Sequence, residues 1–244
     1  QQKRLPARKV VVIRNGCDLA RFDPAHPPPP GLKRSLGFGE EDPVLVVLAR
    51  LEPQKGHALL LQALPPVCAA FPHVRLVFAG EGSLRGALQQ QARELGLEAN
   101  VRFVGYQPNA SDWLALADAT VLPSFFEGLP LVAIESLAAA RPIVATAVDG
   151  TPEVVRDGEN GLLVPPGDPA RLAEAICRIL ADPGWRQRLG RNGREWVLRH
   201  FTRERQVRET QDLYWRAFEQ SSRCAPTGGR ERPAMERSRW MPEG

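Results

Sequence analysis

The sequence has little of what marks a disulfide-rich or metal-dependent protein. Its 244 residues include only four cysteines, Cys17, Cys68, Cys177 and Cys224, with no CxxC pair and no histidine at zinc-site spacing. We therefore expect reduced thiols and neither a disulfide framework nor a zinc site. The sequence also has no DxD motif that could hold a metal on a diphosphate, so no metal is expected.

Long apolar runs are also absent. No stretch of about 18 apolar residues occurs, and the opening residues QQKRLPARK lack the apolar core of a signal peptide. We therefore expect a cytoplasmic protein, in which any peripheral association with the membrane would occur through a part outside this sequence. Because the chain starts at Gln1 without a methionine, we also expect it to be a fragment.

Charge of one sign is not in excess. The 32 basic and 28 acidic residues give a formal net charge of +4 and are mixed along the chain, which does not indicate a nucleic-acid partner. With 43% hydrophobic residues the composition is that of a soluble domain. We predict a hinge or linker at 1–30, one principal domain at 31–220, and a disordered tail at 221–244, where apolar residues are scarce.

Apolar runs of β type alternate with helical patterns from Pro43 onward, which predicts parallel βαβ units. The predicted strands are residues 44–49, 74–79, 101–104, 119–122, 142–146 and 161–164. The predicted helices are residues 56–70, 83–96, 111–117, 130–140, 151–156, 169–181, 184–199 and 202–218. This pattern predicts a Rossmann-like, doubly wound parallel α/β sheet, in which ligands bind beyond the carboxyl ends of the strands.

Two local patterns lead to further expectations. KVVVIR at residues 9–14 predicts another short buried strand, and residues 15–30 predict an extended linker. Pro65 and Pro66 fall within the helical pattern at 56–70, where each removes a backbone hydrogen bond and clashes with the preceding turn. We therefore expect that helix to break.

The stretch SFFEGLPLVAIE, residues 124–135, is the strongest candidate for a binding site. Gly128 permits a tight turn, and Pro130 suits the first position of a helix. Glu127 would then lie on the loop before the helix and Glu135 about five residues into it, roughly 7 Å along its axis. Two carboxylates placed in this way could hold opposite ends of one ligand.

The helix start within this stretch also favours an anion. The first free amides, at Leu131 and Val132, would point in front of the turn, toward a spot beside both carboxylates. A pair of glutamates at a fixed spacing is weak evidence by itself, because such pairs arise by chance. The preceding apolar run at 119–122 and the amphipathic segment up to Ala140 strengthen it. The arrangement suits a polyhydroxylated ligand that carries phosphate.

Two cations follow the first strand of the alternating pattern. ARLEPQKG, residues 49–56, places Arg50 and Lys55 between a strand end and a helix start. The planar guanidinium and the mobile ammonium together could neutralise a diphosphate. Basic loop residues are more often simply solvated, but their position after the first core strand favours a binding site.

Two further loops follow strands. FAGEGS at 78–83 contains Gly80-x-Gly82, but Arg85 stands where a dinucleotide fingerprint needs its third glycine, so a nicotinamide cofactor is poorly supported. The glycines are expected instead to let the chain pass close to a ligand or a neighbouring loop. VRFVGYQP at 101–108 ends another strand, whose backbone is expected to border a nucleobase.

Together these motifs resemble the C-terminal, donor-binding domain of retaining family 4 glycosyltransferases (glycosyl transferases group 1), which have the GT-B architecture. The resemblance covers residues 9–218. It is carried in order by VIRNGCDLARFDP, ARLEPQKG, FAGEGS, VRFVGY, the Glu-x7-Glu segment and DGTPEVVRDGENGLLVPPGD. One departure is Asp149 before Gly150, where relatives often have two glycines, so the backbone there is expected to sit differently.

The resemblance implies roles for individual residues. Arg50 and Lys55 would hold the donor diphosphate. Glu127 would contact hydroxyls of the transferred sugar, and Glu135 would take the ribose hydroxyls. Backbone near the sugar, the phosphate or the base would come from Gly128, Leu129, Leu131, Val132, Val104 and Gly105.

The implied activity is transfer of a hexose from a nucleotide-diphosphate sugar to a glycan or lipid-linked acceptor in polysaccharide biosynthesis, with retention of configuration and without a metal or cofactor. A UDP-sugar is favoured, then GDP-mannose. An N-terminal acceptor domain lies outside this sequence, so we expect the chain alone to be inactive and Leu213, Trp215 and Phe218 to pack toward that domain. A non-catalytic nucleotide-sugar module remains open and, less favoured, an NAD-dependent Rossmann enzyme.

Overall fold

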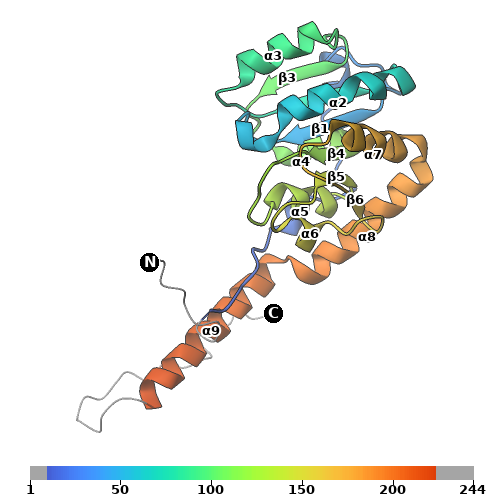
Figure 1. The fold of residues 1–244 in the computed structure, drawn as a ribbon. Coiled ribbons are helices and arrows are strands. Elements are labelled where there is room, and N and C mark those ends of the chain that lie inside the picture. The colour runs from blue at the N-terminus through green and yellow to red at the C-terminus, as the bar shows by residue number, and fades with distance from the viewer. Residues whose placement is uncertain (1–9, 224–244) are drawn as a thin grey trace, which may run out of the picture. The chain divides into compact units, whose positions relative to one another are not determined.

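A computed structural model describes residues 10–223, without the side chains of 221–223 (Figure 1). The strands are β1 (Val44–Leu48), β2 (Arg75–Ala79), β3 (Val101–Gly105), β4 (Ala119–Leu122), β5 (Ile143–Thr146) and β6 (Gly161–Val164). The α-helices are α1 (Leu32–Ser35), α2 (His57–Ala70), α3 (Arg85–Glu94), α4 (Ala110–Leu116), α5 (Leu131–Ala138), α6 (Thr151–Val154), α7 (Pro169–Ala181), α8 (Pro183–His200) and α9 (Arg203–Arg223). Short 3-10 turns are η2 (Leu19–Arg21) and η3 (Pro53–Lys55).

The strands form one six-stranded parallel sheet in the order β3-β2-β1-β4-β5-β6. Its observed strands agree with the six predicted strands to within one residue at each end. Because the chain returns from the outer strand β3 to pair β4 beside β1, the order of the strands reverses between β1 and β4. The prediction of a Rossmann-like, doubly wound sheet is confirmed.

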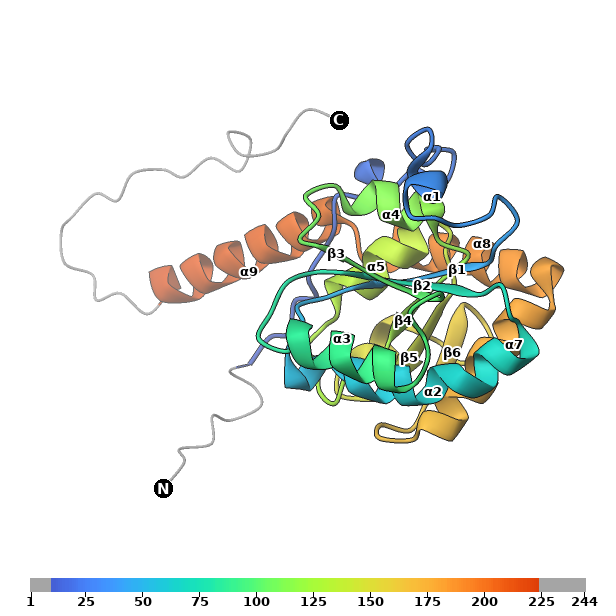
Figure 2. The same cartoon turned by 90° about the horizontal axis from the view of Figure 1, so that it is seen from above.

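Helices cover both faces of the sheet, as the two views show (Figures 1 and 2). On one face α2 packs against α7 and α3, and on the other lie α4 and α5, with α8 packed on α5. Side chains of β1 alternate between these layers: Leu45 and Val47 join the α2 and α7 cluster, and Val44 and Val46 join the cluster that includes α4. Burial on both faces explains the unbroken apolar run of β1.

The predicted strand at residues 9–14 is wrong for residues 10–14, and residue 9 lies outside the described part. Residues 10–14 pair with no described strand, and the side chain of Val12 is 79% exposed. Arg14 instead forms an ion pair with Glu153, with Nε 2.6 Å from Oε2. A short apolar run becomes a strand only where a sheet edge is available to pair with it.

The segment expected to be an extended linker is docked on the domain at residues 17–22. The Cys17 amide donates to the carbonyl of Phe201 at 2.9 Å. Leu19 and Phe22 are buried in the cluster around α5 and α8. The expectation of an extended linker is corrected at residues 17–22, because these two apolar side chains are buried in the core.

The expected break at Pro65 and Pro66 is also wrong, because α2 runs without interruption through both residues. Proline at these positions removes two intrahelical hydrogen bonds. The neighbouring Leu64 and Val67 are fully buried against the sheet and α7. Burial of such side chains stabilises the helix by about 1.5–3 kcal/mol each, enough to offset the lost hydrogen bonds.

From Val207 onward helix α9 belongs to a second compact unit, and the helix includes the first three residues of the predicted tail. The remaining tail residues lie outside the described part. Leu213 and Trp215 are half-buried and Phe218 is 37% exposed, so none of the three is buried. Their packing toward another domain stays a prediction. No described helix is long and apolar enough to span a bilayer.

The fold requires a glycine at position 56. Gly56 has a φ of 66°, and a Cβ placed there would lie 1.9 Å from the carbonyl oxygen of Pro123. We predict that Gly56→Ala lowers the free energy of unfolding by about 2–4 kcal/mol, because it adds backbone strain and a clash. Chemical denaturation of the purified chain measures this change.

Gly86→Ala is the matched control, because a Cβ at Gly86 in α3 meets no atom within 4 Å. This variant is expected to gain about 0.5–1 kcal/mol from reduced entropy of the unfolded chain. A Gly56→Ala variant as stable as wild type would contradict the requirement for close approach of the two loops.

Candidate functional site

The loops after β1 and β4 meet where the order of the strands reverses. The Phe125 amide, after β4, donates to the carbonyl of Gln54, after β1, at 2.8 Å. The close approach of Gly56 to Pro123 brings the same two loops together. In doubly wound sheets this point is the crevice in which ligands bind. These two loops carry three of the predicted site residues, Arg50, Lys55 and Glu127.

Lys55 and Glu127, 72 positions apart in the chain, form an ion pair with Nζ 2.6 Å from Oε1. The side chains are only 16% and 9% exposed. The same carboxylate oxygen accepts a hydrogen bond from the Ser124 hydroxyl at 2.7 Å. Thr146 in turn donates its hydroxyl to the Ser124 carbonyl. Sequence reasoning did not assign a role to either hydroxyl, because the apolar strand patterns give no signal for them.

Arg50 presents a cation at the same strand end. Arg50 is exposed, and its guanidinium forms no hydrogen bond or ion pair with any residue in the described part of the chain. Its carbonyl is fixed by the buried ring of His57, whose Nε2 lies 2.8 Å away. Burial lowers the pKa of His57, so the ring is neutral and donates this hydrogen bond. Arg50 therefore has an anchored backbone and a side chain available to an anion.

Glu135 lies on α5, half-buried, and its carboxylate has no hydrogen bond or ion pair within the described residues. Burial raises its pKa, and Arg21 opposes the shift. Burial also raises the pKa of Cys17 to about 11, with a further contribution from the negative charge of Glu135. The charge of Glu135 therefore lies close enough to the docked segment to interact with Cys17 and Arg21. The structure does not bring it into contact with Glu127, and sequence reasoning missed Arg21.

The start of α5 carries free amides just after the loop that follows β4. Pro130 is the residue before the helix, and Leu131 is its first residue, which corrects the expected start by one position. The amides of Leu131 and Val132 have no acceptor in a preceding helical turn, so this helix end favours a negative charge. Leu129, on the loop just before, is half-buried.

Gly128 lies in a bend before α5, as expected, but the bend does not require a left-handed glycine there. Its φ lies outside the left-handed region, and a Cβ there would meet no atom within 4 Å. The protein itself therefore has room for a side chain at this position. The glycine leaves open backbone beside Glu127 and the start of α5.

The predicted base-binding backbone lies at the end of β3. Gly105 has a φ of 75°, and a Cβ there would lie 2.8 Å from the Glu81 carboxylate, which pairs with Arg85 at 2.5 Å. The Val104 carbonyl accepts a hydrogen bond from the side chain of Gln107 at 2.7 Å. Three strand spacings separate β3 from β4, so these residues lie roughly 14 Å from the Lys55 and Glu127 pair.

The glycines of FAGEGS serve a neighbouring loop, one of the two roles expected of them. A Cβ at Gly80 would lie 1.9 Å from the Ala49 carbonyl oxygen, and one at Gly82 would lie 2.4 Å from that of Leu51. The pair also follows β2, whereas the dinucleotide fingerprint belongs to the turn after the first strand. These contacts favour a structural role and give no support to a nicotinamide site.

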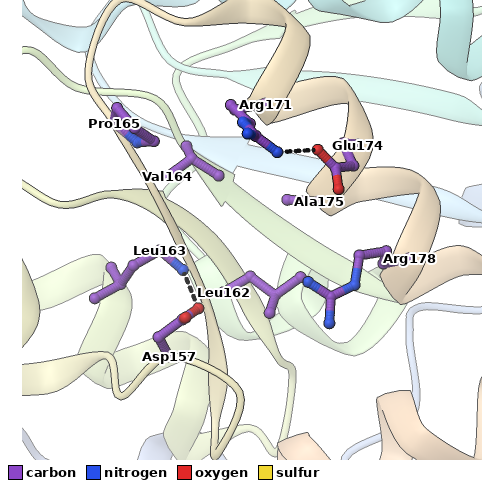
Figure 3. Close-up of a pocket in the computed structure, with 9 residues that line it drawn as sticks. All are labelled: Asp157, Leu162, Leu163, Val164, Pro165, Arg171, Glu174, Ala175 and Arg178. Atoms are coloured by element: carbon purple, nitrogen blue, oxygen red, sulfur yellow. Dashed lines mark hydrogen bonds and ion pairs between the residues drawn. The ribbon is translucent and has the colours of Figure 1, made fainter.

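A separate cavity of about 240 Å³ lies at the outer edge of the sheet, between β6 and α7 (Figure 3). None of the predicted site residues lines it. Most of its polar groups are paired: Asp157 accepts the Leu163 amide at 2.9 Å, and Arg171 forms an ion pair with Glu174 at 2.8 Å. Because these polar groups are already paired, the cavity is a weaker candidate for a binding site than the loops after β1 and β4. In the described residues no group of three or more His, Cys, Asp or Glu is placed to hold a metal.

A doubly wound parallel sheet with the Lys55 and Glu127 pair and a helix start at its switch point defines an α/β domain of Rossmann-like type. The family model described as "Glycosyl transferases group 1" matches residues 31–196, more than half of the 244 residues. The chain belongs to this family of glycosyltransferases, as its motifs predicted.

Similar proteins agree with this assignment. EpsD of Bacillus subtilis, which carries a provisional glycosyltransferase name, is 38% identical over 82% of this chain and 52% of its own length. The lipopolysaccharide core biosynthesis glycosyltransferase LpsE of Rhizobium meliloti is 38% identical over 70% of this chain and 49% of its own length. The chain spans about half the length of the curated relatives it matches.

A solved structure shows the same GT-B half. HepE of Anabaena, crystallised in complex with UDP, aligns with a TM-score of 0.77 at 26% identity, covering 86% of this chain and 58% of HepE. HepE has also been crystallised in complex with UDP-glucose. The alignment supports the Rossmann-like fold of this chain as part of a GT-B glycosyltransferase architecture.

The raised pKa of Glu135 leads to a prediction for stability. The folded chain holds this proton to higher pH than the unfolded chain, so the associated stability is present below the usual pKa of 4.5 and is lost as pH rises through the folded-state value. Glu135→Gln has no carboxyl group at this position, so the variant does not lose this stability as the pH rises. We predict that the variant gains stability over wild type as pH rises from about 4 to about 7, measured by urea unfolding of the unliganded chain.

Glu98→Gln is the control, because the Glu98 side chain is exposed to solvent. Its stability difference from wild type is expected to stay constant over the same pH range. Parallel pH profiles for Glu135→Gln and wild type would contradict a desolvated carboxylate.

Proposed function

We propose that this chain is the donor-binding half of a retaining hexosyltransferase that uses a nucleotide-diphosphate sugar, with UDP-glucose as the favoured donor. The observation that carries the proposal is the Lys55 and Glu127 pair beside Arg50 at the switch point of the sheet. The HepE complexes with UDP and UDP-glucose support the choice of donor. The acceptor is a glycan or a lipid-linked glycan, a choice supported by the name of LpsE.

The spacing of the site suits an extended donor. The base would lie near Val104 and Gly105 at the end of β3, and the sugar near Glu127 after β4, roughly 14 Å away across the strand ends. The diphosphate would lie between them, near Arg50 and the start of α5. Glu135 would take the ribose hydroxyls, because a carboxylate accepts hydrogen bonds from neighbouring hydroxyls.

Lys55 and Glu127 can stay paired while both contact the donor. The ammonium has three donors and gives one to Glu127, so the others can reach a phosphate oxygen. The carboxylate has about four acceptor positions and uses two for Lys55 and Ser124, which leaves others for sugar hydroxyls. The ion pair would thus fix the position of the sugar relative to the phosphate.

In this proposal, leaving-group stabilisation is the main catalytic task of this half. Negative charge grows on the departing diphosphate as the glycosidic bond breaks through an oxocarbenium-like state. Arg50, Lys55 and the amides at the start of α5 would stabilise that charge, the role that preorganised donors have in many enzymes. The acceptor would bind a domain outside this sequence, so the chain alone would bind donor weakly and turn over little.

Arg50→Ala tests the proposal with little effect on the fold, because this exposed side chain forms no hydrogen bond or ion pair with another described residue. We predict an unchanged free energy of unfolding and a loss of about 10²–10³ fold in turnover of UDP-glucose by the complete transferase. Arg191→Ala on α8, also exposed, is the control and should keep wild-type turnover. Turnover of Arg50→Ala within threefold of wild type would refute the assignment.

Lys55→Ala should lose turnover to a similar extent and stability as well, because it leaves the buried carboxylate of Glu127 without its cation. We expect a loss of about 2–4 kcal/mol in the free energy of unfolding. Adding Glu127→Gln should recover much of that stability but not the turnover. Recovery of both would show that Lys55 acts only on the fold.

Gly128→Ala separates ligand approach from folding. A Cβ at this position meets no protein atom, so the melting temperature should stay within about 2 °C of wild type. If the donor approaches the open backbone, the added methyl group should weaken UDP-glucose binding about tenfold or more, as measured by calorimetry. Unchanged affinity would place the donor away from this turn.

A further inference from the structure

Asp149 contacts the glutamate that we place at the transferred sugar. Its carboxylate oxygen Oδ2 accepts a hydrogen bond from the backbone amide of Glu127 at 2.9 Å, across 22 positions in the chain. The contact joins the loop after β5 to the loop after β4. It acts on the backbone of Glu127, whereas Lys55 and Ser124 act on its carboxylate.

The backbone of Asp149 has an uncommon conformation. Its φ is 41°, in the left-handed region, and Asp149 is one of two non-glycine residues in the described chain with a positive φ. Aspartate and asparagine tolerate this region better than other residues with side chains. A glycine would adopt the conformation easily but would offer no acceptor to Glu127.

Gly150 makes a second contact between the two loops. A Cβ at Gly150 would lie 2.0 Å from the carbonyl oxygen of Gly128, so the backbones approach as closely as a glycine allows. This contact puts Asp149 directly beside the turn that contains Glu127 and the exposed ring of Phe126. Phe126 is 55% exposed, so the core does not fix this turn by burying it.

We propose that Asp149 is a positioning residue that holds the Glu127 backbone, so that the Glu127 carboxylate faces the transferred sugar of the donor. The functional part rests on the proposed donor-binding role. With Asp149 in place, Glu127 is held at its carboxylate by Lys55 and Ser124 and at its amide by Asp149. Loss of the amide contact frees the turn while the ion pair remains.

Three substitutions separate the hydrogen bond from the backbone conformation. Asp149→Asn keeps an acceptor and tolerates the left-handed region, Asp149→Gly keeps only the conformation, and Asp149→Ala keeps neither. The first readout is NMR-detected hydrogen exchange of the Glu127 amide in the 244-residue chain. The second is calorimetric binding of UDP and of UDP-glucose to the same chain, which distinguishes contacts to the nucleotide from contacts to the sugar.

We expect Asp149→Gly to speed exchange of the Glu127 amide about tenfold, by loss of one charge-assisted hydrogen bond. The same variant should weaken UDP-glucose binding about five- to tenfold and leave UDP binding within twofold of wild type. Asp149→Asn should keep both the exchange rate of the Glu127 amide and the affinity for UDP-glucose near their wild-type values. Asp149→Ala should show the same defects and lower stability in addition.

Wild-type exchange at Glu127 in Asp149→Gly would overturn the positioning role. Equal weakening of UDP and UDP-glucose binding would overturn the link to the sugar and indicate a general effect on the loops. If the wild-type chain binds neither UDP nor UDP-glucose, the proposed function fails and the sugar role of Asp149 fails with it. The exchange measurement still decides in that case whether Asp149 holds Glu127.

Discussion

The close approach of the loops after β1 and β4 is the constraint on which the site depends. Gly56 passes the carbonyl of Pro123 at a distance that excludes any side chain, and the Phe125 amide closes the junction on Gln54. Only this approach puts Lys55 and Glu127 within 2.6 Å. Because both loops follow neighbouring parallel strands, the sheet order itself fixes where the charges meet.

Within residues 10–223 the site combines a neutralised pair with two charges that have no ion-pair partner. Lys55 and Glu127 are almost buried and stabilise each other. Arg50 is exposed, and Glu135 is partly desolvated without a counter-charge in hydrogen-bonding contact among these residues. A carboxylate held in this way costs stability in the unliganded chain. Such residues are typical of binding sites, because a ligand can supply the partners that the protein does not.

The local sequence predicted the sheet well because its central strands β1, β4 and β5 are buried on both faces and therefore read as apolar runs. The same criterion failed at residues 10–14, where an apolar run has no described strand to pair with. It also failed at Pro65 and Pro66, where packing of α2 outweighs the local preference against proline. The site residues on the two loops were identified from motifs, but Arg21 and Asp149 had no assigned role.

The sequence alone determined the fold class, the family and most of the charged residues at the site, because these depend on local periodicity and on ordered motifs. Only the tertiary structure decided which of those residues act together. In the folded chain Lys55 pairs with Glu127. The charge of Glu135 lies near the docked segment around Arg21. The Glu127 amide donates a hydrogen bond to Asp149. Each of these contacts joins segments far apart in the chain, and only the order of the strands brings such segments together.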